Sequence, residues 1–150
     1  MPTDRSYVKE NNAERRRLEA LIARLDDAAL AAPLPAGWTV AAVLGHLAFW
    51  DQRIVLLAER LRQGAAVPPD SEDQVDWIND AAKPMLLAMP PRRLADLALA
   101  IATAADRAVE SLSDEHLAKN ASLGHPINVL RAEHRREHLD EIEGTLAGRR

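Results

Sequence analysis

The chain has 150 residues, a length that suits one domain, and we expect residues 1–150 to share a single core. Hydrophobic residues make up 47% of the chain, charged residues 28% and aromatic residues only 3%, a balance typical of packed helices rather than of a disordered chain or a β-sandwich. The net charge of -4 argues against a general nucleic-acid-binding protein, and the absence of cysteine excludes disulfides, thiolate ligands and a cysteine nucleophile.

The N-terminal part of the chain predicts two long helices. Apolar residues recur at spacings of three and four through residues 6–32, and Pro33 and Pro35 end this pattern. Thr39 is a suitable N-cap for a second helix, which extends to about Gly64. Its continuous apolar stripe consists of Val43, Leu47, Trp50, Ile54, Leu57 and Leu61.

The next segment is expected to be short and interrupted. Ser71 can cap it, because the serine hydroxyl accepts hydrogen bonds from the free amides of a first turn. Pro84 and then the pair Pro90-Pro91 predict a kink or a break. A third long helix follows over residues 91–112.

The last part of the chain predicts one more long helix. Residues 113–124 are polar and are expected to be irregular, whereas Pro126 fits the first turn of a helix that ends near Leu146. The whole pattern predicts an all-α fold. We expect a bundle of four long helices, with an extra short helical segment between the second and the third.

Charge and hydropathy also bear on location and partners. The basic runs at residues 15–17 and 135–136 lie among acidic neighbours, and we interpret both as solvated helix faces. No segment approaches the roughly 18 to 20 uninterrupted apolar residues of a membrane span, and the charged N-terminus lacks the apolar stretch of a signal peptide. We therefore expect a cytoplasmic protein that binds neither nucleic acid nor membranes.

Two histidines lie one helical turn apart in the last predicted helix. His134 and His138 belong to a row at intervals of four, whose apolar ends predict that the row faces the core. Side chains at this spacing can share one metal ion. The alternative is a partly buried pair that bonds to neighbouring helices, or an exposed pair. The row is Leu130, His134, His138, Ile142 and Leu146.

A third histidine strengthens the metal interpretation. His46 lies on the inward side of the second helix, and facing helices of a bundle commonly build metal sites. Three neutral imidazoles leave a coordination position open for water or substrate, as in catalytic sites. We expect His46, His134 and His138 to bind one divalent ion, with zinc or nickel favoured over iron or manganese. His116 and His125 fit surface or capping roles, although His125 could approach the rim of the pocket.

Three further side chains are candidates for binding a substrate beside the metal: Trp50, Trp77 and Asn79. For the two tryptophans, as for Phe49, the alternative is ordinary core packing along an apolar stripe. Asn79 could instead hydrogen-bond a neighbouring helix.

Carboxylates near the histidines are candidates for fixing the imidazole tautomers. Asp51, Glu137 and Glu141 could each accept a hydrogen bond from an imidazole N–H. Surface salt bridges are the alternative for at least two of them.

Several of these segments resemble the DinB/YfiT-like family of metalloenzymes. The resemblance is carried by Gly37-Trp38-Thr39-Val40, by residues 46–51 from the first histidine to Asp51, and by His134 with Glu137-His138. Residues 75–80 also fit a family segment, so the pattern spans the whole chain in order.

The resemblance implies a four-helix bundle of up-down-down-up topology, a metal centre at His46, His134 and His138, and a homodimer. Some relatives isomerise maleylpyruvate with a thiol cofactor and have glutamate at the middle ligand position, where His134 argues against that subgroup. Other relatives are thiol-dependent transferases or a colibactin-resistance hydrolase.

The expected function is therefore that of a divalent-metal-dependent enzyme, a thiol-dependent transferase or a hydrolase, acting on a small electrophilic molecule. A low-molecular-weight thiol would be its second cofactor. Two alternatives stay open: a metal-containing module that sequesters a small molecule without turnover, and a structural dimer.

Overall fold

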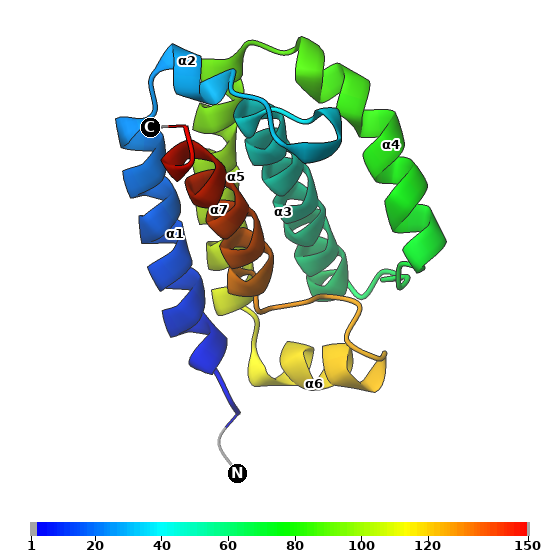
Figure 1. The fold of residues 1–150 in the computed structure, drawn as a ribbon. Helices are drawn as coiled ribbons and strands as arrows, with labels where there is room; N and C mark the ends of the chain where they lie inside the picture. The colour runs from blue at the N-terminus through cyan, green and yellow to red at the C-terminus, as the bar shows by residue number, and fades with distance from the viewer. Residues whose placement is uncertain (1–2, 150) are drawn as a thin grey trace.

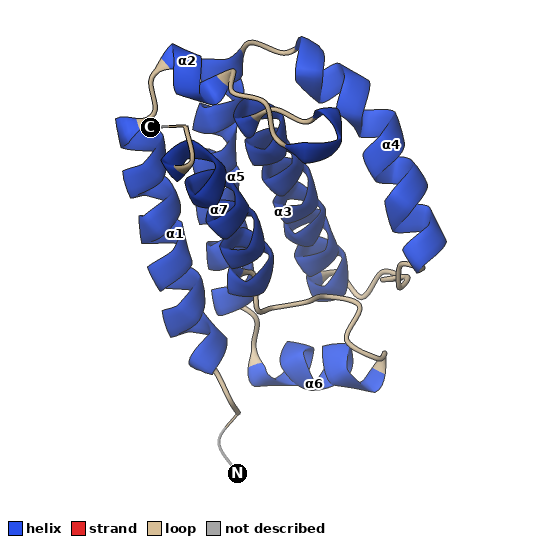
Figure 2. Cartoon of the chain, viewed as in Figure 1, coloured by secondary structure: helices blue, strands red, loops and turns tan. Residues whose placement is uncertain are grey.

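The computed structural model describes residues 3–149, and within this range it contains seven α-helices and no strand (Figures 1 and 2). The prediction of an all-helical fold is confirmed. The helices are α1 (Ser6–Arg24), α2 (Asp27–Leu30), α3 (Val40–Arg62), α4 (Glu72–Ala88), α5 (Pro91–Glu110), α6 (Asp114–Ser122) and α7 (Ala132–Ala147), with a 3-10 turn at Pro35–Gly37.

The four longest core helices, α1, α3, α5 and α7, lie side by side (Figure 1). Helix α3 packs most extensively on α5, while α7 packs on α1 and, less closely, on α3. Leucines from α1, α3 and α5, together with Leu139 and Ile142 of α7, form the core at one end of this bundle. A pocket lies between α3, α4 and α7.

Helix α3 is the most apolar element. It begins as predicted, because the Thr39 hydroxyl accepts a hydrogen bond from the Ala42 amide over 3.1 Å. By length and composition the helix Val40–Arg62 could cross a membrane, but 72% of its most apolar window is buried inside the fold. These apolar residues therefore serve the core of the bundle.

Helix α4 does not end at Pro84, one of the two places where a kink or a break was expected, whereas the predicted interruption at Pro90-Pro91 separates α4 from α5. Ser71 and Gln74 make a reciprocal capping box, and the helix then continues through Pro84 to Ala88. No residue of α4 is buried, so water can satisfy the carbonyl that loses its partner at the proline. The segment is consequently a full helix on the outside of the bundle (Figure 1).

The first helix is shorter than predicted. It ends at Arg24, because Leu25 is extended and Asp26 begins a new helix by accepting from the Ala29 amide over 2.8 Å. Asp26 therefore caps α2, and Asp27 lies in the first turn of α2 instead of continuing α1.

The connection before α7 also differs from the prediction. Residues expected to be irregular form α6, which Ser113 caps through the His116 amide. The last helix begins at Ala132 and not at Pro126. Asn11 of α1 accepts from the Ala132 amide and donates to the Val129 carbonyl, so the start of α7 is fixed by a side chain distant in the sequence.

Candidate metal centre

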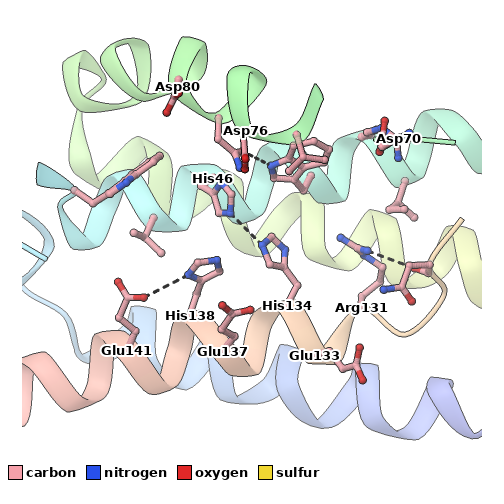
Figure 3. Close-up of a pocket in the computed structure, with 18 of the residues that line it drawn as sticks. His46, Asp70, Asp76, Asp80, Arg131, Glu133, His134, Glu137, His138 and Glu141 are labelled. Carbon is pink, nitrogen blue, oxygen red and sulfur yellow. Dashed lines mark hydrogen bonds and ion pairs between the residues drawn. The ribbon is translucent and has the colours of Figure 1, made fainter. Parts of the chain in front are cut away.

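Three histidines meet between α3 and α7. His46 comes from α3, and His134 and His138 come from successive turns of α7; Figure 3 shows the three imidazoles pointing toward one another. The Nε2 atoms of His46 and His134 lie 3.0 Å apart, and one ring nitrogen from each histidine lies within 4.8 Å of the others. The ring centroids are 4.8 to 5.0 Å apart.

The rotation of α7 places its histidines at the edge of the core. The buried residues of the helix are Ala132, Arg135, Leu139 and Ile142. His134 and His138 lie beside that stripe and are partly exposed to a pocket. The prediction that their row faces the core is therefore only partly right, because the pocket gives a ligand access to both imidazoles.

Burial keeps all three imidazoles neutral. It lowers the pKa of His46 to about 4, and the nearby His138 adds to this effect. Burial lowers the pKa of His134 further, to about 2, with contributions from the other two histidines and from the guanidinium groups of Arg131 and Arg135. The pKa of His138 is also lowered by burial, although adjacent carboxylates oppose this change.

These imidazoles fit a divalent metal ion. A neutral imidazole offers a lone pair, which is the form of histidine that binds metals. Two Nε2 atoms at 3.0 Å need either a shared proton or a cation between their lone pairs. The Nδ1 atom of His138 faces Glu141 at 3.9 Å and has no hydrogen-bond partner among residues 3–149, so it takes no part in binding to another side chain of the site. The donor set suits zinc or another borderline ion.

The histidines line a pocket of about 1120 Å³ between α3, α4 and α7. Trp38 forms part of its wall, with its ring edge-on to the His46 imidazole at a centroid distance of 5.8 Å. Carboxylates from α4 and α7 surround the histidines, as Figure 3 shows for Asp76, Asp80 and Glu137. The volume is sufficient for a small molecule.

Two of the three candidate substrate-binding residues line this pocket. Trp50 donates its indole N–H to the Oδ1 atom of Asn79 over 2.8 Å, which joins α3 to α4. The guanidinium of Arg53 lies 5.9 Å from the Trp50 ring and pairs with Asp70 at 2.8 Å. Trp77 lies outside the pocket lining, and 62% of its surface is exposed. Trp77 therefore neither packs in the core nor lines the pocket, the two positions considered for it from the sequence.

The carboxylates proposed as imidazole partners have different positions. Glu137 and Glu141 line the pocket, and Glu141 lies near His138 without a hydrogen bond. Asp51 is 2% exposed and pairs with Arg131 at 2.9 Å and with Arg135 at 3.2 Å. Its carboxylate therefore contacts guanidinium groups and not an imidazole.

The sequence interpretation missed a buried charged cluster beneath the pocket. Arg135 was expected on a solvated face, yet it is 1% exposed and binds Asp106 of α5 through two hydrogen bonds of 2.7 and 2.9 Å. Arg15 was also assigned to a solvated face and pairs with Asp106 at 2.6 Å. The spacing of Arg135 to Leu139 and Ile142, by four and seven, is the signal that could have placed it inward.

The two remaining histidines lie away from the pocket. His116 is part of α6, and its amide is bound by the Ser113 hydroxyl. His125 is exposed and has a positive φ of 57° in the turn after α6. Neither contributes to the pocket lining.

Comparisons with known proteins identify the family of the chain. The sequence model of the mycothiol maleylpyruvate isomerase N-terminal domain matches residues 12–143. Two uncharacterized proteins of Mycobacterium tuberculosis, from strains CDC 1551 / Oshkosh and ATCC 25618 / H37Rv, are each 33% identical over 93 residues. The match covers 60% of this chain and 36% of each relative, so the chain spans about a third of their length. No solved structure matches significantly.

The matched residues extend through both histidines of α7. The match shows the domain family, and the expectation drawn from His134 about the isomerising subgroup stays a prediction. The chain belongs to the mycothiol maleylpyruvate isomerase N-terminal domain family, which is part of the DinB/YfiT-like clan.

Proposed function

We propose that this protein is a divalent-metal-dependent enzyme that acts on a small electrophilic molecule. The observation that carries the proposal is the convergence of His46, His134 and His138, all neutral, on one point in the wall of an open pocket. Zinc or nickel is the expected ion. When bound, it would lower the pKa of a water molecule or a thiol and so provide a nucleophile at neutral pH.

The surrounding residues would bind and orient the substrate. The hydrogen bond to Asn79 fixes the indole of Trp50, so that its ring can serve as a rigid apolar wall. Both side chains lie in the same pocket as the histidines. A substrate held there would have its reactive atom close to the three imidazoles.

A low-molecular-weight thiol is the second cofactor that we propose. The chain contains no cysteine, so any thiol chemistry needs a thiol from outside. The family is named after an isomerase that uses mycothiol. The pocket is large enough to admit such a thiol together with a small electrophile.

A reaction assay tests this proposal. Zinc-loaded and nickel-loaded protein would be incubated with mycothiol and 1-chloro-2,4-dinitrobenzene, and conjugates would be measured by mass spectrometry. We expect product above the uncatalysed rate only when metal, thiol and electrophile are all present. His46→Ala should remove this rate, whereas His116→Ala, a histidine outside the pocket, should retain it.

The other outcomes identify different functions. Product without thiol would indicate a hydrolase. Tight stoichiometric uptake of the electrophile without product would support a sequestering module. No uptake and no product with this and related electrophiles, together with an unchanged fold in His46→Ala, would support a structural protein and contradict the proposal.

We also propose that the protein is a cytoplasmic homodimer with the up-down-down-up helix order of its relatives. An apolar groove of about 520 Å³ between α3, α4 and α5 supports the dimer, because Phe49 and Leu56, which line it, are 42% and 50% exposed. Light scattering of the purified protein tests the association. A monomer at all concentrations would contradict it.

A further inference from the structure

Three guanidinium groups and two carboxylates form a charged cluster beneath the histidines. Asp51 of α3 and Asp106 of α5 are the acids, and Arg15, Arg131 and Arg135 are the bases. The two acids, Arg131 and Arg135 are each at most 5% exposed. The cluster therefore joins α1, α3, α5 and the beginning of α7 inside the bundle.

The first half of α7 depends on this cluster for its position. The large apolar residues that α7 buries, Leu139 and Ile142, both follow His138 in the sequence. Before that point, the helix buries Ala132 and Arg135. The segment that carries His134 is thus held mainly by polar contacts, namely the ion pairs of Arg135 and the hydrogen bonds of Asn11 to the start of the helix.

Asp51 connects the same two helices that carry the histidines. Its Oδ1 atom accepts from Arg131 Nε over 2.9 Å, and its Oδ2 atom accepts from Arg135 Nη2 over 3.2 Å. Asp51 lies five residues after His46 on α3, while Arg135 directly follows His134 on α7. Asp51 therefore links α3 directly to the start of α7 beside the site, while Asp106 and Asn11 bind the same part of α7 from α5 and α1.

Stability alone is a poor explanation for such a cluster. Buried ion pairs often contribute little net stability, because the cost of removing the charges from water offsets their attraction. This cluster also leaves the Nε atom of Arg135 buried without a partner among the described residues. Defining the geometry of two helices is the better-supported role, since hydrogen-bonded charges have directional requirements that apolar contacts lack.

We propose that Asp51 is a positioning residue, which holds α7 against α3 through Arg131 and Arg135 so that His46, His134 and His138 converge on one metal ion. The inference rests on the proposed function. Asp51 acts through the two arginines and does not contact the imidazoles.

Zinc affinity of the folded protein tests the proposal, measured by competition with a chromophoric chelator. Asp51→Asn should weaken zinc binding by about 10- to 100-fold, the range seen when groups that orient metal ligands are removed. The matched control is Asp140→Asn, which also removes a carboxylate that joins α7 to another helix through an arginine, in this case Arg17 of α1, but at an exposed position. The control should bind zinc as the unaltered protein does.

A second variant distinguishes a positioning effect on zinc binding from an electrostatic effect. It also tests the proposal if Asp51→Asn does not fold. Arg131→Gln removes one partner of Asp51 together with a positive charge near the histidines. A purely electrostatic effect would make zinc bind more tightly. Positioning predicts weaker binding and an altered visible absorption spectrum of the cobalt-substituted protein.

The outcomes distinguish the two proposals. If the unaltered protein takes up no zinc, nickel or cobalt, the proposed function fails and this inference fails with it. If the unaltered protein binds zinc, while Asp51→Asn folds with unchanged affinity or Arg131→Gln binds more tightly with an unchanged cobalt spectrum, the positioning role alone is overturned.

Discussion

Trp50 of α3 and Asn79 of α4 are joined by a hydrogen bond of 2.8 Å between the indole N–H and the amide oxygen. The bond links a helix of the core to a helix that has no buried residue. Both residues line the pocket of the three histidines. The bond therefore contributes to the closure of one side of the site.

Removal of this bond should loosen α4. In Asn79→Ala the indole N–H loses its acceptor, which costs about 1 kcal/mol for a typical hydrogen bond. We expect faster amide hydrogen exchange in α4 and unchanged exchange in α5, measured by mass spectrometry. Asp80→Ala, a change at the neighbouring pocket residue, is the control. Equal exchange rates in the two variants would show that the bond does not hold α4.

The stability of the metal-free protein should depend on pH through the histidines. An unfolded histidine titrates near 6.5, whereas burial holds the pKa of His46 at about 4 and that of His134 at about 2. Between these values and 6.5 the unfolded chain binds more protons than the folded chain. We therefore expect the free energy of unfolding to fall as the pH decreases below 6.5, and this contribution to be constant above it.

Urea denaturation with a chelator present, between pH 7.5 and 5, measures this dependence. His134→Gln removes one titrating imidazole, so the stability of this variant should fall less steeply with decreasing pH than that of the unaltered protein. Well below pH 6.5 the two slopes should differ by about 1.4 kcal/mol per pH unit. Carboxylates titrate in both proteins and cancel in the difference. Equal slopes would mean that His134 is not held neutral by the fold.

The helices could largely be predicted from the sequence, because their signals are local. Thr39 and Ser71 cap α3 and α4 as expected, since a capping residue acts on amides only three residues away. The start of α7 could not be predicted. It is set by Asn11, which lies 121 residues from Ala132. Pro84 does not end α4, where water can bind the carbonyl that the proline leaves without a partner.

Two glycines, one in α3 and one in α7, test how closely these helices are packed. A Cβ atom at Gly45 of α3 would lie 2.7 Å from Leu94 and 2.8 Å from Leu86. Gly45→Ala should therefore destabilise the protein by about 1 to 3 kcal/mol through overpacking. At Gly144 of α7 no atom lies within 4 Å, so Gly144→Ala should stabilise it by about 0.5 to 1 kcal/mol. Thermal denaturation measures the stability of both variants. If both substitutions raised the stability, or both lowered it, the packing described for these two positions would be contradicted.

Asn11 should contribute more to stability than its neighbour. It is 1% exposed and satisfies both the Val129 carbonyl and the Ala132 amide. Asn11→Ala would leave these groups without partners, at a cost of about 1 to 3 kcal/mol. Asn12 is half-buried and its side chain makes no hydrogen bond to residues 3–149, so Asn12→Ala should change the free energy of unfolding by less than about 0.5 kcal/mol. Similar losses in both variants would show that the start of α7 is held in another way.

The candidate site was predictable in part. The three histidines could be grouped because two share a helix face and the third lies on an apolar stripe. The partners of Asp51 could not be found in this way, since Arg131 and Arg135 lie 80 and 84 residues further along the chain. A charged side chain with distant partners resembles a solvated one when the sequence is considered alone.

Metal content tests the central claim most directly. The metal content of the untagged protein would be measured by elemental analysis, both as purified and after exposure to dilute zinc or nickel followed by gel filtration. The same measurements would be made on His46→Ala, His134→Ala and the control His116→Ala. We predict about one divalent ion per chain in the unaltered protein and the control, as one three-histidine group implies, and loss of the ion in the first two variants. No metal in the unaltered protein before or after exposure, or an equal amount in all four proteins, would contradict a metal centre at these histidines.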